Sequence, residues 1–245
     1  MIRADDLGYS KAVNYGIYES VKHGLIQNIG FMVNMPASLH GFELVKNLDI
    51  CLGQHTNVCL GKPISDPKKI PSLVQVDGTF KTSRMYRNSK EDFVVLEEAI
   101  LEIEMQYQRF KEITGSKPHY FEAHAVQSKH LMDAIDIVGK RHGLKTVGIS
   151  LDGTPVMVNG KKMYMHLKSM DPEYDPLQCF LDMIANTHED GYDMMICHPG
   201  YIDEELLHSS SLTTPRVKEV TMLTNQKLKE WIKQKEIHLY TYDEI

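Results

Sequence analysis

Along the chain, short apolar runs typical of buried strands alternate with longer segments in which apolar residues recur at helical spacing. The strand-like runs lie at residues 29–34, 49–55, 119–124, 146–150, 193–198 and 237–242. The helical pattern predicts helices over residues 14–23, 41–48, 91–114, 131–142, 176–187 and 218–235. This alternation predicts a parallel β-sheet whose faces are covered by helices.

The number of strand–helix units favours a closed or nearly closed (β/α) barrel over an open doubly wound sheet. We therefore expect an α/β fold of the TIM-like barrel type, in a distorted or seven-stranded form, with its active site at the carboxyl ends of parallel strands. Residues 61–90 and 151–175 are rich in turn residues and are expected to be irregular, the first as a long excursion over the surface. No repeat or linker divides the chain, so residues 1–245 are predicted to form a single domain.

Composition and charge exclude several classes of protein. The 245 residues are 42% hydrophobic and 24% charged, as in an ordinary globular protein, and the net charge of −6 argues against nucleic-acid binding. No apolar run approaches the ~18 residues that cross a bilayer, and no basic and apolar leader opens the chain, so no membrane partner is expected. The cysteines lack CxxC spacing and are predicted to be reduced thiols of a cytoplasmic protein: Cys51, Cys59, Cys179 and Cys197.

Polar residues that can bind a metal stand at the carboxyl ends of four predicted strands. They are the pair Asp5 and Asp6, then His55, His124 and His198. In a parallel α/β sheet these strand ends share one edge, where such folds place their active sites. We therefore expect these side chains to face a common site.

The acid pair in RADDLGYS raises a question of geometry, because adjacent side chains of a strand point to opposite faces. The first strand is expected to end at Arg3 or Ala4, and so short a strand would suit a natural chain that begins before Met1. A turn opened by Gly8 would let both acids reach one site, where a cation would offset their repulsion. The alternative is an ordinary turn, with Ser10 capping the next helix.

This set of side chains is suited to the hydrolysis of an amide without a covalent intermediate. One carboxylate and two imidazoles can hold a divalent ion and leave positions open for water or substrate. A second carboxylate can act as general base on the bound water. A further histidine can protonate a departing amine or stabilise the oxyanion.

Four stretches together resemble the YdjC-like carbohydrate deacetylase family, which includes chitooligosaccharide deacetylases. They are RADDLGYSKAVNYGI, GQHTNVCLGKP, the strand that ends at His124 and CHPGYID, in this order over nearly the whole chain. The resemblance implies a (β/α) barrel and a metal-dependent hydrolase that removes N-acetyl groups from acetylated amino sugars, such as chitooligosaccharides or a phosphorylated disaccharide. It also implies a small carbohydrate partner and a homodimer.

The resemblance assigns roles to particular residues. Asp6, His55 and His124 match the family's metal ligands, and Asp5 matches the proposed catalytic base. His198 matches the second catalytic group. The ion usually described for the family is Mg²⁺, whereas a ligand set of two histidines and one aspartate suits Zn²⁺ or another first-row ion.

Two further residues and one departure complete the comparison. Arg216, in TPRVKEV, takes the place of a family arginine and could pair with Asp5 or another site acid, or be a solvated arginine at a helix start. Tyr201, after HPG, could bind substrate by stacking on a sugar ring, or simply pack.

Family members usually continue after His124 with more histidines. This chain has Ala125, Val126 and Ser128 in their places. His130 could return toward the site or begin a helix.

Other polar groups are expected to be structural or solvated. The excursion over residues 61–90 carries a basic cluster that could bind an anionic sugar phosphate or remain in solvent. Its residues are Lys62, Arg84, Tyr86 and Arg87. The remaining histidines share no spacing and are predicted to be structural: His40, His119, His166, His188, His208 and His238.

Three hypotheses about function stay open. The preferred one is a metal-dependent carbohydrate N-deacetylase. The second is a phospho-disaccharide glycosidase, which needs two carboxyl groups roughly 5–9 Å apart across the scissile bond. The third is a sugar-binding or regulatory protein that has lost turnover, suggested by the histidines that are missing after His124.

Overall fold

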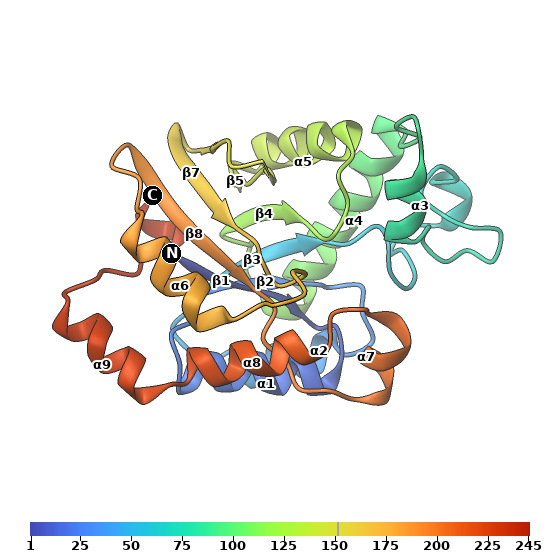
Figure 1. Ribbon diagram of the computed structural model, residues 1–245. Helices are drawn as coiled ribbons and strands as arrows, with labels where there is room; N and C mark the ends of the chain where they lie inside the picture. Colours follow the sequence, from blue (N-terminus) through green and yellow to red (C-terminus); the bar gives the residue numbers. More distant parts are fainter. Residues whose placement is uncertain (151) are drawn as a thin grey trace.

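The structure, a computed structural model, describes residues 1–150 and 152–245 (Figure 1). Its strands are β1 (Ile2–Leu7), β2 (Asn28–Phe31), β3 (Cys51–Thr56), β4 (Tyr120–Ala123), β5 (Lys145–Thr146), β6 (Val156–Val158), β7 (Lys161–His166) and β8 (Gly191–Cys197). Its α-helices are α1 (Lys11–Lys22), α2 (Ser38–Val45), α3 (Ser83–Asn88), α4 (Leu96–Thr114), α5 (Lys129–His142), α6 (Pro176–Ala185), α7 (Glu204–Ser209), α8 (Thr214–Leu223) and α9 (Gln226–Gln234). Two short 3₁₀ helices are η1 (Pro67–Lys69) and η2 (Tyr242–Glu244).

The described strands form one eight-stranded sheet in the order β5-β4-β3-β2-β1-β8-β7-β6. Neighbouring strands are parallel except in the β6–β7 hairpin. The sheet curls until its edges approach: a Cβ on Gly148, just after β5, would lie 3.6 Å from Cγ1 of Val156 in β6. The sequence prediction of a nearly closed, distorted barrel is thereby confirmed, and the carboxyl ends of the parallel strands meet at one end of it (Figure 1).

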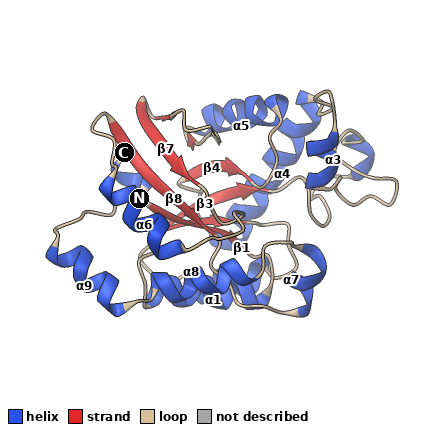
Figure 2. Ribbon diagram, viewed as in Figure 1, coloured by secondary structure: helices blue, strands red, loops and turns tan. Residues whose placement is uncertain are grey.

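Helices line the outside of the barrel (Figure 2). Apolar side chains pack both between these helices and the sheet and inside the barrel. One outer core, around Ile29, joins β1 and β2 to α1 and α8, and another, around Phe121 and Ile135, lies under α4 and α5. A third group fills the amino-terminal end of the interior, where Tyr242 packs on Tyr120 with ring centroids 4.0 Å apart. The opposite end of the interior is thereby left to polar residues.

Predictions about strands are wrong in three segments, the first of which is residues 146–150, where β5 already ends at Thr146. No strand forms at residues 237–242 of the described chain, because Tyr242 turns into the barrel interior and donates its backbone N–H to Asn28 Oδ1 (3.0 Å). Residues 151–175 were predicted to be irregular. Residue 151 lies outside the described residues, and residues 152–175 are not irregular throughout, because they contain the β6–β7 hairpin. That hairpin extends the sheet, because β7 pairs in parallel with β8.

The helix predicted over residues 218–235 is two helices, α8 and α9. Helix α8 already begins at Thr214, and Asn225 then caps α9, because its side-chain oxygen accepts the N–H of Leu228 (3.2 Å). None of the helices in the described residues combines the length and apolar composition needed to cross a membrane.

The predicted surface excursion between β3 and α4 is held against the barrel by polar contacts. The buried carboxylate of Glu102, on α4, accepts the backbone N–H groups of Ile64 (3.0 Å) and Ser65 (2.9 Å). Tyr86, on α3, donates its hydroxyl hydrogen to the carbonyl of Val58 (3.0 Å), which lies just beyond β3. The excursion is therefore fixed beside the carboxyl end of β3.

Candidate metal centre

Strand β1 runs through both acids, instead of ending at Arg3 or Ala4 as the sequence suggested. The β1–β2 register shifts after Ala4, and Asp6 has a φ of +78°. Aspartate visits this left-handed region more readily than most residues, because its short polar side chain can hydrogen-bond locally. The irregularity resolves the geometric question, since it brings Asp5 and Asp6 to the same histidine, His55.

The turn after β1 is fixed by Gly8 and Asn14. Gly8 has a φ of +99°, and a Cβ there would lie 2.6 Å from the carbonyl oxygen of Met32, so a larger residue would displace the backbone. The N–H of Gly8 donates to Asn14 Oδ1 (2.6 Å), and Asn14 donates to the carbonyl of Ala37 (3.0 Å). Ser10 also caps α1, so this segment is both a capped turn and part of the site.

Three ligand-type atoms converge at the carboxyl end of the barrel. Asp6 Oδ1 lies 3.2 Å from His55 Nε2 and 3.0 Å from His124 Nδ1, and the two nitrogens are 2.9 Å apart. Three ligand atoms at neighbouring corners of an octahedron, each about 2.1 Å from the ion, lie about 3.0 Å from one another. The spacing therefore fits a single divalent ion, and His124, with 13% of its side chain exposed, is the most accessible of the three residues.

Buried charge around these atoms also favours a cation. Carboxylates outnumber guanidinium groups among the buried residues of the centre, which are Asp5, Asp6, Glu122, Arg3 and Arg216. In a site shielded from water this excess of negative charge is costly unless a cation or bound protons offset it.

The two histidines respond to this excess. Burial alone would lower the pKa of each ring, but Glu122 and Asp5 raise the pKa of His55 to about 9, and Asp6 raises the pKa of His124 well above its usual range. Both rings therefore bind protons when no metal is bound. A divalent ion that displaced the two protons would keep the charge balanced, which is how metal sites commonly release protons.

Glu122 is a residue that the sequence analysis missed, and it orients His55. Its Oε1 accepts the Nδ1–H of His55, which leaves Nε2 free to face the other ligand atoms. A carboxylate on the second nitrogen is the usual device that fixes the tautomer of a metal-binding histidine. Gly30 leaves room for it, because a Cβ there would lie 2.6 Å from Glu122 Oε1. A signal existed: Glu122 stands two residues before His124 in a predicted strand, hence on the same face.

Asp5 is held by Arg3, a second residue that the sequence analysis missed. Arg3 Nε donates to Oδ1 (2.6 Å) and Nη2 donates to Oδ2 (2.8 Å), and Nη2 also lies 3.5 Å from Glu122 Oε2. Burial raises the pKa of Asp5, but Arg3 and the nearby histidines lower it, and the net shift is downward. Asp5 is therefore ionised, and each oxygen keeps a lone pair that can accept a proton.

Arg216 is buried rather than solvated, and its acidic partner is the second acid of the pair. Nη2 donates to Asp6 Oδ2 (2.6 Å), while Nε and Nη1 donate to the carbonyls of Leu212 (2.9 Å) and His198 (3.3 Å). Burial raises the pKa of Asp6, but Arg216 and His124 bring it well below its usual range. Arg216 thus occupies one oxygen of Asp6 while the other faces the histidines.

His198 and Tyr201 follow β8, the neighbour of β1 in the sheet. Burial and Arg216 lower the pKa of His198 to about 4, although the charges of Asp5 and Asp6 raise it. The ring is therefore neutral at neutral pH. Tyr201 is 39% exposed, and its backbone N–H donates to the carbonyl of Ala12 (3.1 Å). Tyr201 is therefore partly exposed and is not one of the buried core residues.

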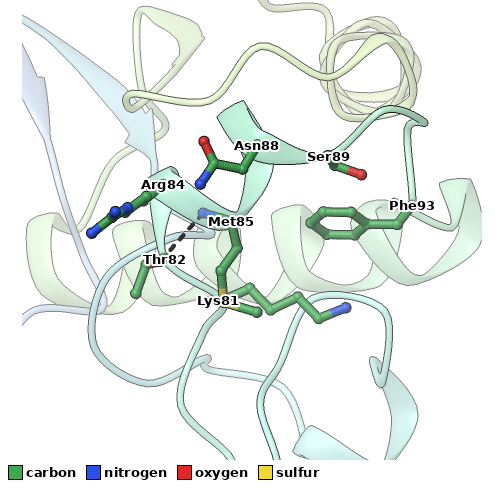
Figure 3. A pocket seen from close by; sticks show the side chains of 7 residues that line it. All are labelled: Lys81, Thr82, Arg84, Met85, Asn88, Ser89 and Phe93. Carbon is green, nitrogen blue, oxygen red and sulfur yellow. Dashed lines mark hydrogen bonds between the residues drawn. The ribbon is translucent and has the colours of Figure 1, made fainter.

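The other predicted groups lie outside the metal centre. His130 sits in the first turn of α5 and hydrogen-bonds to the carbonyl of Val94 (2.7 Å) instead of returning toward His124. Arg84 and Lys81 line an open surface pocket built entirely from residues of α3 and its flanks (Figure 3).

The histidines predicted to be structural each hydrogen-bond or pair with a nearby polar side chain. The pairs are His40 with Asn14, His119 with Asp243, His166 and His188 with Asp193, His208 with Glu204, and His238 with Glu244.

A second group of ligand-type side chains, Cys51, His119 and Asp243, lies at the amino-terminal end of the barrel. His119 and Asp243 are exposed and hydrogen-bond to each other (2.8 Å). Burial raises the pKa of the Cys51 thiol to about 12, so the thiolate that a metal needs is disfavoured. The group around Asp6 is therefore the better candidate for a metal centre.

Fold and site together define a (β/α) barrel with a candidate two-histidine, one-aspartate metal centre at the carboxyl ends of its strands. The family model described as YdjC-like protein matches residues 1–234, and the chain belongs to this family. The family predicted from the sequence motifs is thereby confirmed.

Curated relatives match along nearly the whole chain. A carbohydrate deacetylase of Clostridium beijerinckii is 29% identical over 100% of this chain and 99% of its own length. A carbohydrate deacetylase of Halalkalibacterium halodurans is 31% identical over 94% and 97%. A chitooligosaccharide deacetylase of Salmonella typhimurium is 30% identical over 96% and 94%. These relatives agree with the class of enzyme predicted from the sequence.

Solved structures agree with the fold. A protein of Enterococcus faecalis V583, proposed to cleave cellobiose phosphate, has a TM-score of 0.85 at 26% identity and covers 100% of this chain and 97% of its own. A peptidoglycan N-acetylglucosamine deacetylase has a TM-score of 0.51 at 12% identity over 98% and 84%, a likeness of fold alone.

Proposed function

We propose that this chain is a divalent-metal-dependent carbohydrate N-deacetylase. The observation that carries the proposal is the convergence of Asp6, His55 and His124 on one point, beside the ionised Asp5 and the neutral His198. The names of the full-length relatives, carbohydrate and chitooligosaccharide deacetylase, support an acetylated amino sugar as the substrate class.

Asp6 Oδ1, His55 Nε2 and His124 Nδ1 would hold the ion. A divalent cation in this place supplies a Lewis acid for the acetyl carbonyl and lowers the pKa of water. Glu122 would keep His55 in the ligating tautomer, and Arg216 would leave one oxygen of Asp6 free for the ion. The ligand types suit Zn²⁺ or another first-row ion, and the family resemblance implies Mg²⁺.

The remaining side chains supply proton transfer and substrate contact. Asp5 would accept a proton from the attacking water as general base, because Arg3 keeps it ionised and fixed beside the ligands. His198, neutral before the reaction, would take up the proton that the water gave to Asp5 and pass it to the departing amine, so that Asp5 is ionised again at the end. The products are acetate and the free amino sugar. The exposed ring of Tyr201 would stack on the sugar.

Acetate release from N,N′-diacetylchitobiose and from its phosphate, with Mg²⁺, Mn²⁺ or Zn²⁺ and with a chelator, tests this proposal. We expect release with at least one ion and none with the chelator. Asp5→Asn should lower kcat by about 100-fold or more, because it removes the general base, whereas Glu112→Gln changes an exposed carboxylate and should not. If no acetylated sugar yields acetate with any of these ions, the proposal fails.

Product analysis of the same reactions separates the alternatives. A phospho-disaccharide glycosidase, the activity suggested by the Enterococcus faecalis relative, would release a monosaccharide instead of acetate. The carboxylates of Asp5 and Glu122 both contact Arg3, so they lie together and not on opposite sides of a sugar bond. A sugar-binding protein would bind the substrate and form neither product.

A further inference from the structure

Glu219, on α8, is a fully buried carboxylate that belongs to none of the groups of metal-ligand side chains found in the described residues. Its Oε1 accepts the hydroxyl hydrogens of Ser169 (2.8 Å) and Tyr174 (2.7 Å), and its Oε2 accepts the backbone N–H of His198 (2.6 Å). A buried carboxylate is costly unless its oxygens are hydrogen-bonded, and these donors meet that need. The carboxylate therefore connects two hydroxyl groups to the segment that carries His198.

Ser169 links Glu219 to the imidazole ring. Its oxygen lies 3.4 Å from His198 Nδ1, and its side chain is buried. A serine hydroxyl has a single hydrogen, and here that hydrogen is committed to Glu219. The same oxygen can therefore only accept a hydrogen from His198, which requires the hydrogen to be on Nδ1.

We propose that Glu219 and Ser169 are positioning residues that hold His198 in the tautomer protonated at Nδ1, so that Nε2 is the nitrogen that exchanges protons with the reacting groups. Glu219 holds the backbone of His198 directly and the ring of His198 through Ser169. The opposite tautomer would need Ser169 to donate its hydrogen to Nδ1 instead of to Glu219. The buried Oε1 of Glu219 would then lose one of its hydrogen-bond donors.

The arrangement has a consequence for proton transfer, which rests on the function proposed above. When Nε2 accepts a proton at pH 8, where Glu219 is mostly ionised, the positive imidazolium keeps its Nδ1–H on Ser169, and the negative charge of Glu219 lies one hydrogen bond beyond. The charge that develops on His198 is thereby stabilised without any movement of the side chains. Tyr174 holds the carboxylate in place from the other side.

The tautomer can be measured directly by NMR of the full chain with ¹⁵N-labelled histidine at pH 8, with His198→Gln to assign the signal. We expect His198 to be protonated at Nδ1 in the wild type and in Ser169→Thr, which keeps the hydroxyl. Ser169→Ala should lose this preference, and Ser116→Ala, at an exposed serine, should keep it. A wild-type ring protonated at Nε2, or a Ser169→Ala ring unchanged from the wild type, would overturn the inference.

Kinetics add a second readout. Ser169→Ala should lower kcat for acetate release by about tenfold or more while KM stays within about twofold, and Ser169→Thr should restore most of the loss. An equal loss in both variants would indicate a merely structural serine and would count against the inference. The NMR measurement needs no substrate, so it decides the tautomer even if no acetylated sugar is hydrolysed and the proposed function fails.

Discussion

At the scale of single residues, the centre consists of charged groups that restrain one another. Glu122 fixes the ring of His55, Arg3 holds Asp5, and Arg216 occupies one oxygen of Asp6. Each of these partners is buried, so removing one leaves the other without solvent to replace it. Substitutions of the partners should therefore affect metal binding and stability even though none of them is a ligand.

Glu122→Gln should weaken divalent-metal binding by about 10–100-fold, because the variant loses the negative charge that fixes the tautomer of His55. Titration calorimetry with Mn²⁺ or Zn²⁺ measures the change. Glu104→Gln is a matched control, since Glu104 also accepts a histidine N–H, from His142 (2.8 Å), far from the centre. Equal affinities in the two variants would show that Glu122 does not support the ligand.

Arg216→Met should lower the free energy of unfolding by about 3–5 kcal/mol, because it leaves Oδ2 of the ionised Asp6 buried without its charged partner. Urea denaturation of the metal-free protein measures this. Arg109→Met removes an exposed pair with Glu112 and should cost at most about 1 kcal/mol. Adding Asp6→Asn to Arg216→Met should recover part of the loss; no recovery would contradict the ion-pair explanation.

At the scale of elements, parallel strands bring the site together, and this much could be predicted from the sequence. Asp6, His55 and His124 each stand at the carboxyl end of an apolar run, and the ends of parallel strands meet at one edge. Glu122 and Glu219 could not be paired with their histidines, because the partners come from different elements whose register the sequence pattern leaves open.

The elements predicted wrongly share a physical cause, which is that local pattern is overridden by tertiary contacts. The run ending at Tyr242 has the composition of a strand, yet its aromatic ring fills the amino-terminal end of the barrel. The irregular left-handed backbone at Asp6, by contrast, has no pattern that could reveal it, because aspartate before a glycine turn is common without a metal.

Glu102→Ala should loosen the excursion after β3 without unfolding the barrel. The variant leaves the N–H groups of Ile64 and Ser65 without their buried acceptor, at a cost of about 1–3 kcal/mol. Hydrogen exchange followed by mass spectrometry should show faster exchange in peptides that cover these two residues and little change in β8. Glu97→Ala, at an exposed position of the same helix, is the control, and the prediction is wrong if both variants exchange alike.

At the scale of the whole molecule, Glu219 makes stability depend on pH. Burial raises its pKa from 4.5 to about 7, against the opposing hydrogen bonds of Tyr174, His198 and Ser169. Because the folded-state pKa is the higher one, the carboxyl stabilises the fold fully below about pH 4.5, and this contribution is lost as the pH rises through about 7.

Urea denaturation between pH 5 and pH 8 tests this dependence against Glu219→Gln, which cannot titrate. The wild type should lose up to about 3 kcal/mol relative to the variant over this interval. Glu112→Gln, whose side chain is exposed, should follow the wild type at every pH. A constant difference between the wild type and Glu219→Gln would show that Glu219 has an ordinary pKa in the folded protein.

Metal binding should stabilise the whole barrel, because the three ligands come from β1, β3 and the segment after β4. The unfolded chain does not bring these three segments together, so the ion binds the folded state only. At a free ion concentration of about 100 times Kd, the gain is about 2.7 kcal/mol, or a rise in Tm of about 5–10 °C for a chain of this length. Differential scanning calorimetry with Mn²⁺ or Zn²⁺ should show this rise in the wild type and not in His124→Gln. His119→Gln, which changes the group at the opposite end of the barrel, should keep it. If His119→Gln loses the shift and His124→Gln retains it, the ion binds at Cys51, His119 and Asp243, and the metal centre has been assigned to the wrong end of the barrel.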